Sequence, residues 1–583
     1  MNNIKLFFMN RPTLTTKIYL NFQNENHKKL IINIFFLAIF INLSFQLKEE
    51  NIINNNNNEN SLKIKRMIVI IFPGGISHNY IFQNLFDYSI SHENIFKYEY
   101  HIVSHKIDSK IWEEKIQNKS SSYKLFTYGN ASSYKKAFEE AVEIMNNNPI
   151  FGFSGFNKAM ILNIRHFMES DILQTFKMKQ NEYKKKYNED YYDMITTDIP
   201  NFIHKLIYQE LNIKLCLYLL PSLVPQILYP NFEMNPSYMP VIGSIYSDEM
   251  TFIERINNSF IQTFNKFIFY IYRMLQSQLI NSYGFDINNN LHINNAFHMI
   301  QYPLGFSFPF SIPPNWIFLN SITSNDAKII TEEEFNIFLI KYKKNIYFSN
   351  GIIKNIISLN EMISIFKYLE DKNIGAILSI QNEILNENEI KLLSKNVYLS
   401  KYLEQNDILG DKRINIFITN GEYNSVQESI YHIKPMIVLG VELDHYNVAS
   451  FVKKRKIGEV FQRKNLINNK EIISSIEKVL NKKEYYENIM IISKIMKNLK
   501  NPREEFKFWV DFGYKNGFEN FQIPSYSCHF SWIIINGYDI AFIWIIIILI
   551  LILIVKKLIN CMHDCLCGKC ENKHKKNKHF KFD

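Results

Sequence analysis

Three short apolar runs in the second half of the chain end in polar loops that could hold an anionic ligand. The runs NIYF, NIFIT and MIVL lead into Ser349-Asn350-Gly351, Asn420-Gly421 and Glu442–His445, respectively. Each run is typical of a buried strand, and open parallel sheets bind ligands beyond the carboxyl ends of their strands. A helix beginning beside Asn424 and Ser425 would direct free backbone N–H groups toward an anion. The pattern indicates a diphosphate site, although the sequence contains no Walker-type phosphate-binding loop.

Alternating strand and helix patterns predict the elements that position these loops. Met67–Phe72 is a β-branched run that ends in the turn Pro73-Gly74-Gly75, and a helix is expected from Ser77. The same order of strand, turn and helix starts again at Asn345–Gly351. Two successive sets of such units, meeting near residue 340, predict an α/β fold with two Rossmann-like domains.

Apolar segments near both ends of the chain predict a membrane protein. Residues 30–45 are uncharged and follow two lysines, which is typical of a secretory signal. A small-x-small cleavage site is missing, so a cleaved signal peptide and an uncleaved signal anchor both remain open. Residues 540–555 are also uncharged and precede a lysine pair, which predicts a transmembrane helix. Cytosolic segments next to a membrane span carry an excess of Lys and Arg, so we expect the basic tail in the cytosol and the body in the lumen, as in a type I membrane protein.

The distribution of charge argues against a nucleic-acid partner. The formal net charge is +10, but residues 1–29 carry five basic residues and one acid, and residues 556–583 carry eight lysines and three acids. The body is therefore about neutral and lacks the basic stripe of a nucleic-acid-binding domain. Hydrophobic residues make up 47% of the chain, which supports large buried cores and excludes global disorder.

Cysteines and glycosylation sequons are consistent with a lumenal body. Only Cys216 and Cys528 lie in the body, so at most one disulfide can form there. Four further cysteines lie in the tail near His563, where acylation, zinc binding and inert thiols all remain open. The tail cysteines are Cys561, Cys565, Cys567 and Cys570. Sequons at Asn118, Asn130 and Asn257 favour a glycoprotein.

The segment Lys401–Asn447 resembles the animal UDP-glucuronosyltransferases. It contains KYLEQNDILG, FITNGEYNSVQESIYHIKP and ELDHYN, where the family has W-x-P-Q-n-D-L-L-G, F-I-T-H-G-G-x-N-S-x-x-E-a and D-Q-x-x-N. Pro236–Asn258 is similar to the family's P-S-Y-V-P…S-D-x-M-T-F segment. Trp509-Val510-Asp511 is similar to its W-V-E stretch. The resemblance covers residues 66–560.

This resemblance implies the GT-B glycosyltransferase fold, in which the first Rossmann-like domain binds the acceptor and the second binds a UDP-sugar. Tyr402 and Gln405 would contact the uracil, and Glu428 would accept hydrogen bonds from the ribose hydroxyls. The residues that would contact the phosphates are Ser349, Asn420, Gly421, Asn424 and Ser425. Asp444 and His445 would hold the hydroxyls of the sugar.

The resemblance also implies a general base. His78 matches the family's catalytic histidine, which deprotonates the acceptor hydroxyl. Asp198 matches the aspartate that orients this histidine, although a helix N-cap before Ile199-Pro200 is an alternative role for it. The expected reaction is an inverting transfer of glucuronic acid, or of glucose, to a small lipophilic acceptor. UDP-sugar is a co-substrate, and no cofactor or metal is expected.

Four departures from the family pattern keep a second function open. The family has a histidine at the position of Asn420 and a glycine at that of Glu422. It has a glutamine at the position of His445 and a proline at that of Glu404. A carboxylate at Glu422 would repel a diphosphate. The alternative is therefore a catalytically weak or inactive, membrane-tethered relative that binds a ligand or modulates a partner. Residence in the endoplasmic reticulum membrane is implied by the family, and homo- and hetero-oligomers both remain open.

The predicted organisation follows from these segments. In order, it comprises a leader (1–47), a disordered polar spacer (48–65), an acceptor-binding domain (66–340), a UDP-sugar-binding domain with returning C-terminal helices (341–537), a transmembrane helix (538–559) and a basic cytosolic tail (560–583).

Overall fold

A computed structural model describes most of the chain, which divides into two compact units, 1–63 and 64–583. The described residues are 4–6, 18–20, 62–118, 121–147, 153–220, 235–291, 293, 296–303, 305, 308, 315–349, 357–379, 386–400, 403–440, 444–462, 468–518 and 538–566. In the first unit, β1 (Ile4–Leu6) and β2 (Ile18–Leu20) form an antiparallel pair.

The first large sheet has seven strands in the order β5-β4-β3-β6-β7-β8-β9. Its strands are β3 (Lys63–Ile70), β4 (Phe96–His105), β5 (Tyr123–Tyr128), β6 (Met194–Thr197), β7 (Leu215–Leu220), β8 (Ala296–Gln301) and β9 (Trp316–Leu319). The pairs with a described register are parallel. The order reverses between β3 and β6, as in a doubly wound sheet.

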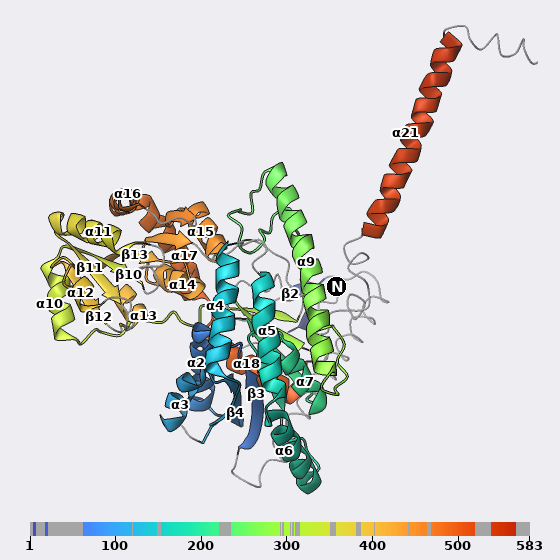
Figure 1. The fold of residues 1–583 in the computed structure, drawn as a ribbon, viewed down its shortest axis with the longest axis horizontal. Helices are drawn as coiled ribbons and strands as arrows, with labels where there is room; N and C mark the ends of the chain where they lie inside the picture. The colour runs from blue at the N-terminus through green and yellow to red at the C-terminus, as the bar shows by residue number, and fades with distance from the viewer. Residues whose placement is uncertain are drawn as a thin grey trace, which may run out of the picture. The chain divides into compact units, whose positions relative to one another are not determined.

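Helices cover both faces of this sheet (Figure 1). Ile68 and Ile70 of β3 pack in one core with α5 (Phe153–Met168), α6 (Ile172–Tyr187) and α7 (Phe202–Glu210). Met67 and Val69 pack on the opposite side with α2 (Ile76–Ser91) and α3 (Ser109–Asn118). Two more helices belong to this half, α4 (Ala131–Asn147) and the long α9 (Phe252–Asn281). Burial on both faces explains why the second half of β3, residues 67–70, is a continuous apolar run and not an alternating one.

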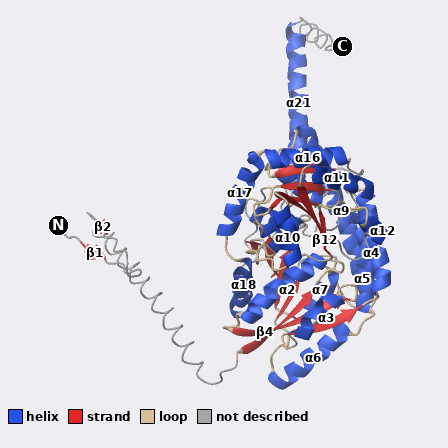
Figure 2. Cartoon of the chain, turned by 90° about the vertical axis from the view of Figure 1, so that its left-hand side faces the viewer, coloured by secondary structure: helices blue, strands red, loops and turns tan. Residues whose placement is uncertain are grey.

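The second large sheet has six parallel strands in the order β12-β11-β10-β13-β14-β15. Its strands are β10 (Lys344–Phe348), β11 (Ile374–Ser379), β12 (Val397–Ser400), β13 (Ile414–Thr419), β14 (Met436–Gly440) and β15 (Gly458–Gln462). Its helices are α10 (Glu333–Lys341), α11 (Leu359–Asp371), α12 (Glu387–Ile390), α13 (Gln405–Gly410), α14 (Tyr423–Tyr431), α15 (His445–Lys454), α16 (Asn469–Asn481) and α17 (Lys483–Asn498). Here the order reverses between β10 and β13. Figure 2 shows the strands among the helices that enclose them.

In the part of the chain that the structure describes, α18 (Pro502–Asn516) and α21 (Tyr538–Leu566) come after the helices of the second sheet. Helix α18 packs against α2, so a C-terminal helix completes the core of the first sheet through Phe506 and Val510. In α21, the segment Tyr538–Asn560 has a mean hydropathy of 3.1 and no buried residues. That segment is long and apolar enough to cross a bilayer.

The α/β fold class with two Rossmann-like sheets and one apolar C-terminal helix is confirmed. Strands predicted at 67–72, 415–419 and 436–439 are found at 63–70, 414–419 and 436–440. The alternative role of Asp198 as a helix N-cap is wrong. The N-cap of α7 is Asn201, whose side chain accepts a hydrogen bond from the backbone N–H of His204.

Candidate active site

The two residues proposed as base and orienting acid lie at the point where the strand order of the first sheet reverses. His78 is in the first turn of α2, which follows β3, and Asp198 directly follows β6. Since β3 and β6 are paired in parallel, their carboxyl ends lie side by side. This is where doubly wound sheets bind their ligands.

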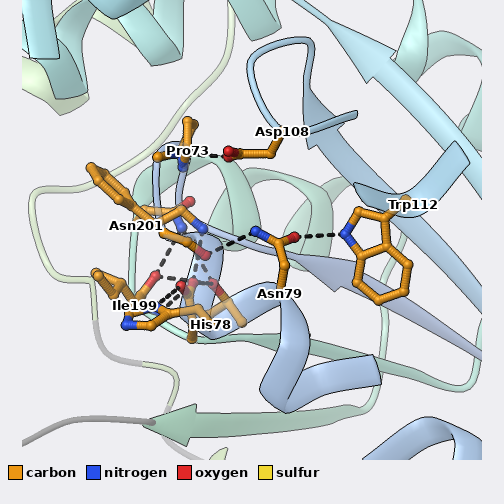
Figure 3. Close-up of polar contacts among 12 residues, drawn as sticks. Pro73, His78, Asn79, Asp108, Trp112, Ile199 and Asn201 are labelled. Atoms are coloured by element: carbon orange, nitrogen blue, oxygen red, sulfur yellow. Dashed lines mark hydrogen bonds and ion pairs between the residues drawn. The ribbon is translucent and has the colours of Figure 1, made fainter. Parts of the chain in front are cut away.

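His78 and Asp198 form a close hydrogen-bonded pair (Figure 3). The His78 Nδ1 atom lies 2.7 Å from Asp198 Oδ2, and the Asp198 side chain is fully buried whereas that of His78 is 17% exposed. The other oxygen, Asp198 Oδ1, accepts hydrogen bonds from the backbone N–H groups of Phe72 (2.9 Å) and Ile199 (2.8 Å). These two backbone donors fix the position of the carboxyl group, which in turn orients the imidazole.

This arrangement determines which ring nitrogen is available for chemistry. An ionised carboxylate only accepts hydrogen bonds, so His78 must donate its Nδ1–H to Asp198. In the neutral imidazole, Nε2 then carries the lone pair. The pair can therefore accept a proton at Nε2 and hold the resulting imidazolium beside a buried negative charge.

A tight turn and the start of α3 present His78 to this partner. Gly74 has φ of +89°, and a Cβ atom added there would lie 3.2 Å from the Phe138 ring. Its N–H donates to Asp108 Oδ2 at 2.7 Å. One residue after the histidine, Asn79 donates to Gly75 O at 2.9 Å and accepts from Trp112 Nε1 at 2.6 Å. Figure 3 shows Asp108, Asn79 and Trp112 grouped around the turn.

Asp108 places a second buried carboxyl group close to the pair. The pKa of Asp108 is raised to about 6, mainly by burial and also by the charge of Asp198, whereas the hydrogen bond from the Gly74 N–H and the charge of His78 lower it. A proton on Asp108 at mildly acidic pH relieves repulsion between the two carboxylates. Sequence reasoning missed Asp108, Asn79 and Trp112, because no motif or spacing links them to His78 and only their contacts do.

The candidate donor residues gather at the corresponding point of the second sheet. Ser349 follows β10 and Asn420-Gly421 follows β13, and these two strands are paired. Ser349 is buried and its N–H donates to Ile418 O at 2.9 Å. Gly421 has φ of +94°, and an added Cβ would lie 2.7 Å from Val438 Cγ1. Only glycine fits this turn, which allows the backbone to reach the N-terminus of α14.

Helix α14 begins with the residues expected at the phosphates and the ribose. Asn424 and Ser425 are its second and third residues, and both are buried. Gln405 Nε2 donates to Ser425 Oγ (3.1 Å) and to Glu428 Oε2 (2.7 Å), which joins α13 to α14. Burial raises the pKa of Glu428 to about 7, with smaller contributions from Glu422 and Glu404. Gln405, Ser425 and Glu428 are therefore brought together.

Gln301 is a further polar partner of α14 that sequence reasoning missed. It ends β8 of the first sheet and is fully buried. Its Nε2 donates to Asn424 Oδ1 at 2.7 Å and to Gln427 Oε1 at 3.0 Å. An Asn424 amide held through its oxygen keeps its NH₂ group free to donate to an anion. The partners are more than 120 positions apart in the chain, so no local pattern indicates the contact.

The remaining predicted residues lie next to this helix or outside the described part of the chain. Asp444 is at the N-cap position of α15 and His445 is its first residue. A Cβ atom added at Gly421 would lie 3.6 Å from His445 Cβ, so these loops are neighbours. Glu422 occupies the N-cap position of α14 without a side-chain cap. Tyr402 lies outside the described residues. Among the described residues, no group of three or more His, Cys, Asp or Glu could hold a metal ion.

Solved structures with the same architecture define the class of fold. The calicheamicin glycosyltransferase CalG4 aligns with a TM-score of 0.51 at 11% identity, over 78% of this chain and 100% of its own. A UDP-glucosyltransferase from Polygonum tinctorium aligns with a TM-score of 0.51 at 10% identity, over 78% and 99%. The two doubly wound sheets are thus those of a GT-B glycosyltransferase.

Sequence comparisons lead from the class to the family. A family model described as "UDP-glucoronosyl and UDP-glucosyl transferase" matches residues 99–573, and the chain belongs to this family. Human UDP-glucuronosyltransferase 2B15 is 27% identical over 79% of this chain and 87% of its own. UDP-glucuronosyltransferase 2B23 of Macaca fascicularis is 27% identical over 56% of this chain and 62% of its own.

Proposed function

We propose that this protein transfers a sugar from a UDP-sugar to the hydroxyl, or a similar nucleophile, of a small lipophilic acceptor. The observation that carries the proposal is the His78–Asp198 hydrogen bond of 2.7 Å, in which a fully buried carboxylate orients a partly exposed imidazole. Membership of a UDP-sugar-dependent family supports the choice of donor.

The mechanism follows from the atoms that each residue exposes. His78 Nε2 removes the proton from the acceptor hydroxyl, and Asp198 stabilises the imidazolium that forms. The acceptor oxygen attacks the anomeric carbon as the bond to the UDP oxygen breaks, which inverts the configuration in one displacement. The N-terminal amides of α14 and the side chains of Asn424 and Ser425 stabilise the negative charge that develops on UDP.

The donor sugar is glucuronic acid, or glucose. The names of the relatives favour glucuronic acid. The acidic side chain of Glu422, at the N-cap position of α14, weighs against a carboxylate on the sugar and favours glucose. The apolar helix α21 would anchor the protein in the endoplasmic reticulum membrane, with the body lumenal and the tail cytosolic. The body would then lie beside the bilayer, from which lipophilic acceptors partition.

The test uses the full-length protein in detergent or nanodiscs, with UDP-glucuronate and UDP-glucose as donors and a panel of lipophilic phenols as acceptors. Transfer is followed by product mass, and the anomeric configuration of the product by NMR. Inversion with one of the two donors is the expected result. His78→Ala should lower kcat by roughly 10²–10⁴-fold, the usual contribution of a positioned base.

His92→Ala provides the matched control, because His92 is the exposed C-cap of the same helix, α2. This variant should retain full activity. A folded wild-type protein that neither binds a UDP-sugar nor transfers one would contradict the proposal. Equal activity of the His78→Ala and His92→Ala variants would contradict the role of His78 alone.

A further inference from the structure

The long helix α9 presents its apolar side chains to the outside. Large hydrophobic residues along Phe252–Asn281 are strongly exposed: Phe252, Ile253, Ile256, Phe260, Phe267, Tyr270, Met274 and Leu275. At 3.6 residues per turn they fall within an arc of about 140°. We call these eight residues the outer face of α9. Monomeric soluble proteins rarely expose a continuous apolar stripe of this length.

The buried side of α9 is largely polar, which reverses the usual pattern of a surface helix. Its buried residues are Asn258, Ile261, Gln262, Asn265, Gln276, Ser277 and Ile280. Hydrogen bonds hold this side against the protein: Asn258 Nδ2 donates to Pro236 O (2.8 Å) and Met239 O (2.9 Å), and Gln262 Nε2 donates to Met239 O (2.9 Å). A helix in contact with water normally turns its apolar side toward the core. Polar packing thus determines the orientation of α9, and this leaves the apolar residues outside.

Basic residues follow one flank of the outer face. Arg255, Lys266 and Arg273 lie within about 20° of one another around the helix at 3.6 residues per turn. Arg255 is exposed, whereas Lys266 and Arg273 are half-buried next to the buried side of the helix. Glu254 is the one acidic residue in the sequence of α9. The Arg255 guanidinium lies 6.0 Å from the centroid of the Phe252 ring. Helices that lie in a membrane interface typically have an apolar face flanked by Arg and Lys, and these cationic side chains contact the anionic headgroups.

We propose that the outer face of α9 binds the surface of the bilayer that α21 crosses. The anchor is in the same chain, and residues 519–537 separate the described body from α21. A chain of that length reaches at most ~70 Å, so the body stays close to the membrane. The face is apolar enough to enter the acyl boundary, and its basic flank selects an anionic surface. The first domain would thus contact the membrane directly, in addition to the attachment through α21. This contact does not depend on the transferase activity.

The contact is tested by photo-crosslinking of the full-length protein in vesicles of phosphatidylcholine and phosphatidylserine that contain a phosphatidylcholine with a diazirine in its acyl chain. Labelled peptides are identified by mass spectrometry. We expect label on α21 and on α9, but not on α6, although Met178 and Tyr187 of α6 are also exposed. Omitting phosphatidylserine should reduce the label on α9 and leave that on α21 unchanged.

Two double variants distinguish an effect of the outer face of α9 from an effect of exposed hydrophobic residues in general. Phe260→Gln with Phe267→Gln removes two rings that are 66% and 60% exposed. Ile337→Gln with Ile340→Gln removes two side chains of α10 that are 62% and 73% exposed. The first pair should lower the label on α9 by roughly fivefold or more, and the second should not change it. The melting temperature in detergent should not change in either, because these side chains are exposed.

Two results would overturn the proposal. One is a wild-type protein whose α21 is labelled while α9 is not. The other is a crosslink between the α9 helices of two copies, obtained with a protein-reactive crosslinker in the same vesicles, together with an unlabelled outer face. That result would assign the face to a dimer. Because the wild-type labelling decides between these outcomes, the proposal stays testable even if a variant fails to fold.

Discussion

In the proposed mechanism, the chemistry of a single histidine, His78, depends on carboxylates that lie elsewhere in the chain. Asp198 is 120 positions from His78, and Asp108 is 34 positions from the Gly74 N–H that it binds. Asp198 orients the ring directly. Asp108 acts through the backbone turn that precedes the histidine, so it is a positioning residue. Its substitutions should therefore affect the geometry of catalysis more than the binding of the donor.

We expect Asp108→Ala to lower kcat by about tenfold and to leave KM for the donor unchanged, because the Gly74 N–H loses its buried acceptor and the turn shifts. Asp108→Asn keeps an oxygen in that place and should retain most of kcat. Steady-state kinetics with varied UDP-sugar measure both quantities. An Asn variant as impaired as the Ala variant would show that the charge matters and not the hydrogen bond.

The pH dependence of stability provides a second test of Asp108. The pKa of Asp108 is raised to about 6, above its ordinary value of 3.8, so the folded protein keeps a proton that the unfolded chain loses in this range. Stability should therefore fall as pH rises from about 4 to 6, by roughly 2–3 kcal/mol for this group. Asp108→Asn should remove this part of the slope. Melting temperatures are measured across this pH range for the wild type, for Asp108→Asn and for Asp171→Asn, which changes an exposed carboxyl group and is the control. Three parallel curves would contradict the assignment to Asp108.

At the same scale, Glu428 should make donor binding depend on pH. Burial raises its pKa to about 7, and only the ionised carboxylate accepts hydrogen bonds with both oxygens. UDP should therefore bind more tightly as pH rises from 6 to 8. Glu428→Gln should weaken UDP binding by about tenfold at pH 8, the worth of one charged hydrogen bond, and should abolish the trend. Titration calorimetry at several pH values measures this, and an unchanged trend in the variant would assign it to another group.

At the scale of elements, the turn between β13 and α14 decides whether α14, the helix proposed to bind the phosphates, can present its first residues. Gly421→Ala would add a methyl group 2.7 Å from Val438 Cγ1 at a residue with φ of +94°. We expect a loss of stability of about 1–3 kcal/mol and a loss of UDP binding. Gly284→Ala is the matched control, since Gly284 has φ of +87° but no heavy atom within 4 Å of an added Cβ. Thermal shift with and without UDP distinguishes strain from steric overlap, and a Gly421→Ala protein with normal UDP binding would refute the argument.

The elements show how far a sequence can predict this fold and where it stops. β13, β14 and the second halves of β3 and β10 are mainly apolar, so the positions of these strands, and a candidate site at their carboxyl ends, could be predicted. The contacts of Asp108 and Gln301 could not, because they join distant segments through single hydrogen bonds. The sequence also does not predict which side of α9 is buried, since an amphipathic helix has the same periodicity whichever side it buries. Asn201, not Asp198, caps α7, a choice that local spacing leaves undecided.

For the whole molecule, helix α18 connects the C-terminal part of the chain to the first sheet. Its Lys507 donates to Asp511 Oδ2 at 2.7 Å and to Asn94 Oδ1 at 2.9 Å, and Tyr98 donates to the same Asp511. Asp511 and Lys507 are both buried. Residues near the end of the body therefore hold β4 and the loop before it.

Removing the cation from this group should destabilise the first domain. Lys507→Met removes the cation beside the buried Asp511, at a cost of about 3–5 kcal/mol, and should lower the melting temperature by roughly 5–10 °C. Adding Asp511→Asn to the same variant should recover at least half of this loss, because the amide still accepts from Tyr98. Differential scanning calorimetry measures both. A single variant as stable as the wild type would show that α18 contributes packing alone.

The packing of α18 also has a consequence for the order in which the chain is made. The last strand of the first sheet ends at Leu319, but the helix that covers one of its faces begins at Pro502. At the usual ~5–20 residues per second, the roughly 180 residues between them take about 10–40 s to synthesise. During this interval the apolar face of Phe86 and Phe297 lacks its cover. The first domain is thus the first to be made and among the last to be complete, and an apolar face of its sheet stays open to non-native contacts during this interval.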